Sequence, residues 1–150
     1  MLYVECYPDE MLARTLGVPR RELRHERGKG NILNRLRKVS AGKGMVDEDP
    51  DAHQPQELQK YREVGRKGRL VLMQHTTNPA KQLILISPRL EEWLYERASD
   101  CGVNPKDYGL PGSADELHDT PHYEANHNFE EFLRQLQKDD EVQCLKRWIG

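Results

Sequence analysis

The sequence has few of the features that stabilise secreted or membrane-spanning proteins. Its three cysteines, Cys6, Cys101 and Cys144, are widely spaced and form no CxxC pair, which is typical of reduced thiols rather than of a disulfide framework. No apolar run approaches the roughly 20 residues that cross a bilayer, and the first residues lack the basic and apolar regions of a secretory signal. These absences predict a cytoplasmic protein that does not associate with membranes.

Aromatic and apolar residues are also scarce. Aromatic residues make up 7% of the 150 residues and hydrophobic residues 36%, whereas 32% are charged. A chain of this length is long enough for one domain but too short for two sizeable cores. We therefore expect a single domain with an economical core and a strongly solvated surface.

The net charge of -2 conceals an asymmetry along the chain. Residues 1–43 carry a net charge of +5 and residues 44–150 a net charge of -7. A basic surface beside an acidic site suits a protein that handles a polyanion such as nucleic acid. The same charges are also compatible with ordinary solvated helices.

Acidic residues follow two short apolar segments of the chain. Glu5 ends Leu2-Tyr3-Val4-Glu5, and Asp47 and Asp49 end Gly44-Met45-Val46-Asp47-Glu48-Asp49. In an open parallel sheet, ligands bind outside the carboxyl ends of the strands, so these carboxylates are expected to converge although they lie far apart in sequence. Hard oxygen ligands suit Mg²⁺ or Mn²⁺, and such metal sites commonly cleave or join phosphodiesters.

The pattern of apolar residues predicts an α/β fold with a central, mostly parallel sheet of four to five strands flanked by helices. Expected strands cover residues 2–5, 22–27, 43–47, 69–75 and 82–86, and expected helices include residues 56–64 and 89–99. We expect Ser87 to act as the N-cap of the second of these helices. Residues 102–128 are rich in turn formers and predict a loop with one short helix at 113–118, followed by two amphipathic C-terminal helices.

The two acidic segments resemble the motifs of Toprim domains. Tyr3-Val4-Glu5-Cys6-Tyr7-Pro8-Asp9-Glu10 is similar to the opening of that family, where a strand ends in Glu-Gly, and Met45-Val46-Asp47-Glu48-Asp49-Pro50 is similar to its DxD strand. The resemblance covers about residues 1–99 and leaves residues 100–150 as a loop-rich segment with C-terminal helices packed on this Toprim-like core. Toprim domains are the metal-dependent catalytic fold of topoisomerases, bacterial primases, small RNA-maturing nucleases and the overcoming-lysogenization-defect (OLD) nucleases.

This resemblance implies a role for each acidic residue. Glu5 corresponds to the general acid or base, and Asp47 and Asp49 to the ligands of Mg²⁺. Asp9, Glu10 and Asp51 resemble the additional acids that OLD-like nucleases use for a second metal. Cys6 departs from the family, which has Gly at this position, and a side chain there is unfavourable where positive φ or close backbone approach is needed.

The segment from Ile84 to Leu94 resembles a strand-to-helix element of stand-alone Toprim-like proteins that partner ATPases in mobile elements or phage defence. In that element Glu91 or Glu92 would face the site. The resemblance therefore implies an ATPase as a possible protein partner, beside DNA or RNA as substrate.

Basic residues near the expected site are candidates for nucleic-acid binding. Lys29 lies in Gly28-Lys29-Gly30-Asn31, which is typical of a turn before a helix and only weakly of a phosphate-binding loop; Arg24, Arg27 and Arg35 lie nearby in sequence. These side chains would position a phosphate backbone without reading its sequence. The histidines at 118, 122 and 127 with Glu124 have spacings compatible with Zn²⁺, although a solvated polar loop is the better interpretation.

Two other functions fit the same sequence. The first is a non-catalytic Toprim-like module that binds an ATPase partner or nucleic acid without cutting. The second is an unrelated Mg²⁺-binding α/β domain, such as a receiver-like fold with Asp47 as phosphate acceptor. The sequence alone does not choose between DNA and RNA or between endonuclease and exonuclease action.

Overall fold

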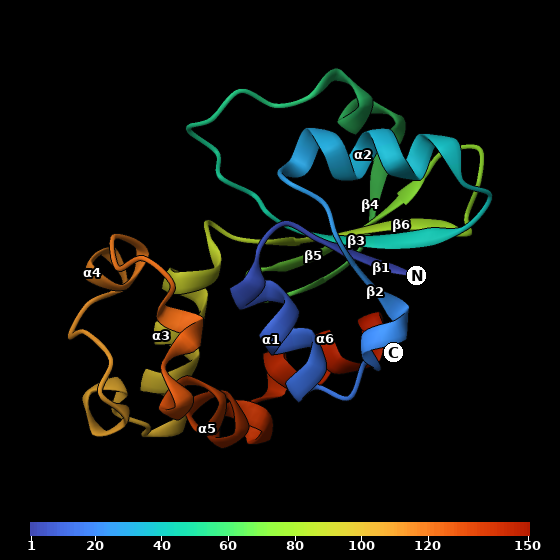
Figure 1. Cartoon of the computed structure of the whole chain (residues 1–150). Helices are drawn as coiled ribbons and strands as arrows, with labels where there is room; N and C mark the ends of the chain where they lie inside the picture. Colours follow the sequence, from blue (N-terminus) through green and yellow to red (C-terminus); the bar gives the residue numbers. More distant parts are fainter.

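The computed structural model describes residues 1–150 as strands and helices arranged around one six-stranded sheet (Figure 1). The strands are β1 (Leu2–Val4), β2 (Leu23–His25), β3 (Gly42–Asp47), β4 (Tyr61–Lys67), β5 (Leu70–His75) and β6 (Lys81–Ile86). The α-helices are α1 (Tyr7–Thr15), α2 (Lys29–Lys38), α3 (Leu90–Cys101), α4 (Ala114–His118), α5 (His127–Gln135) and α6 (Asp140–Ile149). None of these helices has the length and apolar character needed to cross a membrane.

The sheet is mixed and its order is β2-β1-β3-β6-β5-β4. The pairs β2-β1, β1-β3 and β3-β6 are parallel, whereas β6-β5 and β5-β4 are antiparallel. The α/β class with flanking helices is thus confirmed, but the sheet has one strand more than expected. A flavodoxin-like sheet of order 2-1-3-4-5 continues with a further parallel strand after its fourth position. In this protein the antiparallel hairpin of β5 and β4 takes that place beside β6.

The additional strand is β4, and the predicted helix at residues 56–64 was wrong. Only a 3₁₀ turn forms at Gln56–Lys60, after which the chain pairs with β5. Gly68 has φ +56° and closes the tight connection between β4 and β5. Because β4 is an edge strand whose residues are mostly exposed, its polar sequence lacks the apolar alternation that indicates a strand.

Helices cover both faces of the sheet. In Figure 1, α2 lies over one face, and α1, α3, α5 and α6 gather on the other. Alternate strand residues point to opposite faces, so Tyr3 and Val46 pack under α2 while Val4 and Met45 join the larger core. Gly44 allows α2 to approach β3, since a Cβ there would lie 2.6 Å from Ile32 Cγ2.

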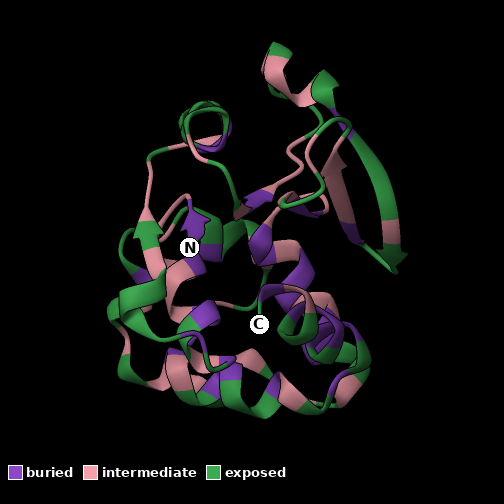
Figure 2. Ribbon diagram, turned by 90° about the vertical axis from the view of Figure 1, so that its right-hand side faces the viewer, coloured by how far each residue is buried: buried purple, intermediate pink, exposed green.

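The C-terminal part of the chain completes the larger of the two cores. Of the 25 residues in that core, eleven come from residues 110–149, including the fully buried Phe129 and Phe132. Figure 2 shows the resulting pattern, with buried segments facing inward along the helices and exposed segments outside. Trp93 and Leu94 lie on the buried face of α3.

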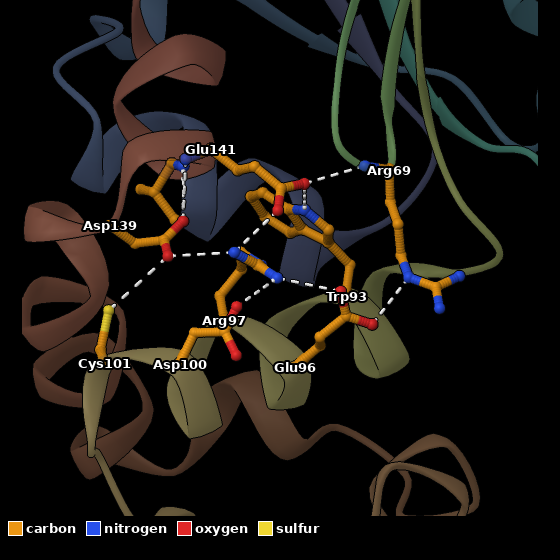
Figure 3. A network of polar contacts seen from close by, with 9 residues as sticks. Arg69, Trp93, Glu96, Arg97, Asp100, Cys101, Asp139 and Glu141 are labelled. Atoms are coloured by element: carbon orange, nitrogen blue, oxygen red, sulfur yellow. Dashed lines mark hydrogen bonds and ion pairs between the residues drawn. The ribbon is translucent and has the colours of Figure 1, made fainter.

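A buried polar network fastens α3 to α6 and to the β4-β5 connection (Figure 3). Arg97 Nη1 lies 3.1 Å from Asp139 Oδ1 and 2.7 Å from Glu141 Oε2. Glu141 Oε1 accepts hydrogen bonds from the Arg69 N–H at 2.9 Å and from Trp93 Nε1 at 3.3 Å. A buried carboxylate is tolerated only where it is paired and hydrogen-bonded, so the guanidinium is what makes this acidic pair stable inside the protein.

We predict that Arg97→Met destabilises the protein by about 3–5 kcal/mol, because it leaves two carboxylates buried without a counter-charge. The control is Arg134→Met, which removes exposed ion pairs to Glu130 and Glu131 and should cost less than about 1 kcal/mol. Denaturant unfolding of both variants measures the difference. Equal destabilisation would contradict the assigned role of Arg97.

Candidate functional site

The candidate site lies at the carboxyl ends of β1 and β3. These strands are neighbours in the sheet. Since β2 and β3 lie on opposite sides of β1, the order in which strands are added to the sheet reverses at β1. Such a switch point is where open α/β sheets bind ligands. Glu5 Oε1 accepts a hydrogen bond from the Asp47 N–H at 2.9 Å. Two residues that the sequence predicted to converge, 42 positions apart, are therefore in direct contact.

Asp47 also caps a helix. Its Oδ1 accepts a hydrogen bond from the N–H of Leu90, the first residue of α3, at 3.0 Å. Arg89 occupies the N-cap position and makes no side-chain capping bond, so the expectation that Ser87 caps this helix was wrong. The helix begins too late for Ser87, and a side chain from β3 binds the free N–H instead.

Asp9 joins the site from the first turn of α1. It is 2% exposed, and Cys6 Sγ donates a hydrogen bond to its Oδ2 at 3.2 Å. Burial and the nearby Asp9 charge raise the pKa of the Cys6 thiol, so it remains protonated and available as a donor. The backbone at Cys6 is extended, with φ -150°, so a side chain at this position causes no backbone strain.

Glu91 is the fourth carboxylate of the site. The sequence indicated that either Glu91 or Glu92 would face the site. The structure turns Glu91 inward with 8% exposure, whereas Glu92 forms an ion pair with Arg89. Glu91 Oε1 accepts a hydrogen bond from the Tyr123 hydroxyl at 3.1 Å, while its Oε2 is buried without a partner. The sequence indicates Glu91 only through its position: it follows the apolar Leu90 in the first turn of α3, on the face of the helix that is buried.

These carboxylates perturb one another. Burial, followed by the charges of Asp9, Glu5 and Glu91, raises the pKa of Asp47 to about 9. Burial likewise raises the pKa of Asp9 to about 7, and the pKa of Glu5 lies above its usual value for the same reason. Groups of like charge this close cannot all ionise without help. The site therefore holds protons near neutral pH unless a cation replaces them.

Asp49 and Lys29 form the outer part of the site. A pocket of about 260 Å³ is lined by Glu5, Asp47, Asp49 and Lys29. Asp49 has φ +45°, a conformation that residues with a side chain rarely adopt, and its N–H donates to the Pro88 carbonyl at 2.7 Å. Backbone of this kind is concentrated at functional sites.

Lys29 is held by the loop after β3. Its Nζ donates hydrogen bonds to the Glu48 carbonyl at 2.6 Å and to Gln54 Oε1 at 2.8 Å. Burial lowers the pKa of Lys29, although the charges of Glu5 and Asp49 oppose this shift. Through these hydrogen bonds Lys29 anchors the acidic loop beside the pocket that it lines with the carboxylates.

The remaining predicted residues lie outside this cluster. Asp51 is exposed and makes no side-chain hydrogen bond. Arg35 forms an ion pair with Glu26 at 3.0 Å, and Arg24 and Arg27 are exposed on or just after β2. The structure thus brings together Glu5, Asp9, Asp47 and Asp49 with Lys29 and leaves the others at the periphery.

Nowhere in the structure do three or more His, Cys, Asp or Glu side chains form a group that could hold a metal ion as they stand. This finding includes the histidines at 118, 122 and 127, of which His122 lies 3.7 Å from Glu124. No protein-family model matches the chain, and no curated protein and no solved structure was found to be similar to it.

We predict that the metal-free protein loses stability as the pH rises from 5 to 9. The folded state retains protons on Asp9 and Asp47 that the unfolded chain releases near pH 4, so this stabilisation is complete below pH 4 and disappears as the pH passes the folded pKa values of about 7 and about 9. Unfolding in EDTA across this range measures the effect.

Asp47→Asn should raise stability at pH 8 by at least about 1.4 kcal/mol, the equivalent of one pKa unit, because the amide does not ionise and can still accept the Leu90 hydrogen bond. Asp51→Asn, which changes an exposed side chain, is the matched control and should leave the pH profile unchanged. A profile for Asp47→Asn that matches the wild type would contradict this interpretation.

Proposed function

We propose that the protein is a Toprim-like, Mg²⁺-dependent domain that acts on phosphodiester bonds of nucleic acid as a nuclease. The observation that carries the proposal is the hydrogen bond between Asp47 and Glu5 at the switch point of the sheet. It supports the assignment because it joins the two motifs on which the resemblance to Toprim domains rests. The order and spacing of these motifs agree with a site between β1 and β3.

The chemistry of the site fits a divalent cation. Glu5 and Asp47 each use one carboxylate oxygen for a backbone N–H and keep the second oxygen, and Glu91 Oε2 has no partner. Several buried carboxylates that repel one another are stabilised by a hard cation, which replaces the protons they otherwise hold. Asp47 and Asp49 would hold the ion, and small side-chain movements would be needed to complete its ligand shell.

When bound, Mg²⁺ or Mn²⁺ would polarise a phosphoryl oxygen and lower the pKa of an attacking water. Glu5 would accept or donate the proton, and its raised pKa brings it closer to the neutral range in which general acids and bases work best. The exposed Arg24 and Arg27 would attract the phosphate backbone toward this edge of the sheet.

A second candidate function is a non-catalytic module that binds nucleic acid or an ATPase partner. The lack of a preformed group of metal ligands favours it, since a domain that has lost catalysis has no need to keep such a group. The contact between Cys6 and Asp9 also favours it, because the thiol occupies an oxygen that a second metal would use. The two functions differ in whether the protein cleaves nucleic acid when a divalent cation is present.

The first prediction concerns metal binding. Mg²⁺ or Mn²⁺ should raise the thermal midpoint of the wild-type protein at pH 8, because a ligand that binds only the folded state stabilises it. Asp47→Asn and Asp49→Asn should abolish this shift, whereas Asp119→Asn, an exposed residue after α4, should retain it. Thermal unfolding with and without the ion measures the effect, and an equal shift in all variants would disprove the assigned site.

The second prediction concerns activity. Purified protein should cleave plasmid DNA or structured RNA with Mg²⁺ or Mn²⁺, and EDTA should stop the reaction. Glu5→Gln and Asp47→Asn should each lower the rate at least about 100-fold, the lower range for a general acid–base group, while Asp119→Asn leaves it unchanged. Gel analysis of the products measures cleavage, and a wild type that is inactive on every substrate but still shows the thermal shift would favour the non-catalytic module.

A further inference from the structure

An exposed aromatic ring follows Glu5 by two residues in the chain. Tyr7, the first residue of α1, is 57% exposed, and among the large hydrophobic side chains only Met1 and Val64 are comparably exposed. Its ring packs against that of His25 at the end of β2, with centroids 4.5 Å apart and an angle of 32° between the planes. This contact covers one side of the Tyr7 ring and holds the other side toward solvent.

A pocket of about 390 Å³ opens next to this ring. Its lining residues are Tyr7, Glu10, Met11, Arg14, Arg20, His122 and Glu124. This volume lies within the range of roughly 300–1,000 Å³ that is typical of pockets for small ligands. The lining combines the Tyr7 ring with two guanidinium groups and two carboxylates, of which Glu124 lies 3.7 Å from His122. The ring can bind a flat ligand, and the guanidinium groups of Arg14 and Arg20 can bind a negative charge on it.

The surrounding segment carries positive charge without internal partners. Five arginines in residues 14–27 are exposed, and none forms an ion pair or a side-chain hydrogen bond within the protein; they are Arg14, Arg20, Arg21, Arg24 and Arg27. Elsewhere, Arg35, Arg66 and Arg134 each pair with a glutamate. A planar guanidinium that is not paired is well suited to binding phosphate.

From these features we propose that the pocket binds one unpaired nucleotide of a single-stranded nucleic acid, with its base stacked on Tyr7 and its phosphate bound by Arg14 and Arg20. The proposal rests on the proposed function and specifies its substrate as single-stranded at this position. Tyr7 follows Glu5 by two residues, so their Cα atoms lie within about 7.6 Å. A nucleotide on Tyr7 is therefore adjacent to the phosphodiester that would react at Glu5.

Stacking on Tyr7 selects single-stranded nucleic acid over a duplex. In a duplex both faces of a base are covered by its neighbours, so a base reaches an aromatic side chain only when it is unpaired and unstacked. Stacking of this kind tolerates any base, because every base has an aromatic face. The pocket thus selects for single strands without selecting for sequence.

The test is fluorescence anisotropy with labelled single-stranded DNA, single-stranded RNA and blunt duplex DNA, all of mixed sequence and in EDTA. The wild type should bind a single strand at least tenfold more tightly than the duplex, and the DNA and RNA arms identify which sugar the pocket takes. Tyr7→Ala should weaken single-strand binding about tenfold, whereas Tyr7→Phe should preserve it. Arg14→Gln should reduce the salt dependence of binding.

Val64→Ala is the matched control, because Val64 is similarly exposed but lies on the edge strand β4, and it should bind as the wild type does. Unchanged binding by Tyr7→Ala, equal binding of duplex and single strand, or no binding at all would overturn the proposal. Since binding is measured without metal, Tyr7-dependent binding by a protein that never cleaves would refute only the nuclease function. Cleavage that does not depend on Tyr7 would refute only the pocket.

Discussion

Burial of like charges is the constraint around which this protein is organised. Glu5 directly follows β1, and Asp9, Asp47 and Glu91 lie in α1, β3 and α3; the four carboxylates meet where the strands end. Asp9 and Glu91 lie in the first turns of their helices, where the positive end of the helix dipole favours a carboxylate. The backbone N–H groups of Asp47 and Leu90 bind two of the others. The fold thus supplies partial positive charge but not enough to compensate four anions.

The second group of buried acidic residues differs from this site in its counter-charge. Asp139 and Glu141 are as deeply buried, yet Arg97 lies within 3.1 Å of both. That cluster has a guanidinium in direct contact with both of its carboxylates and has a structural role in joining α3 to α6. Lys29 lines the same pocket as Glu5 and Asp47 but donates its hydrogen bonds to the loop rather than to the carboxylates. Acidic groups left without a counter-charge are the ones that indicate a functional site.

The sequence predicted the parts of the structure that depend on local patterns. Short apolar runs followed by acids indicated β1 and β3, and the contact between Glu5 and Asp47 followed from the geometry of parallel sheets. The edge strand β4 was not predictable in the same way, because its side chains are exposed and carry no apolar period. The cap of α3 was also missed, since Asp47 is distant in sequence from Leu90. The orientation of Glu91 depends on Tyr123, which lies in a segment that the sequence indicated only as loop.

The larger core has a consequence for how the chain folds as it is synthesised. Leu2 and Ile149 belong to the same group of packed residues, and Tyr123 from the last third of the chain holds Glu91 in place. The first strand therefore lacks some of its packing partners until the helices α5 and α6 have been synthesised, and part of its apolar surface is exposed during that time. Contacts of such long sequence separation also slow folding after release. Glu91 of the acidic site is held by Tyr123, so a chain interrupted before Tyr123 has both acidic motifs but lacks the group that holds Glu91.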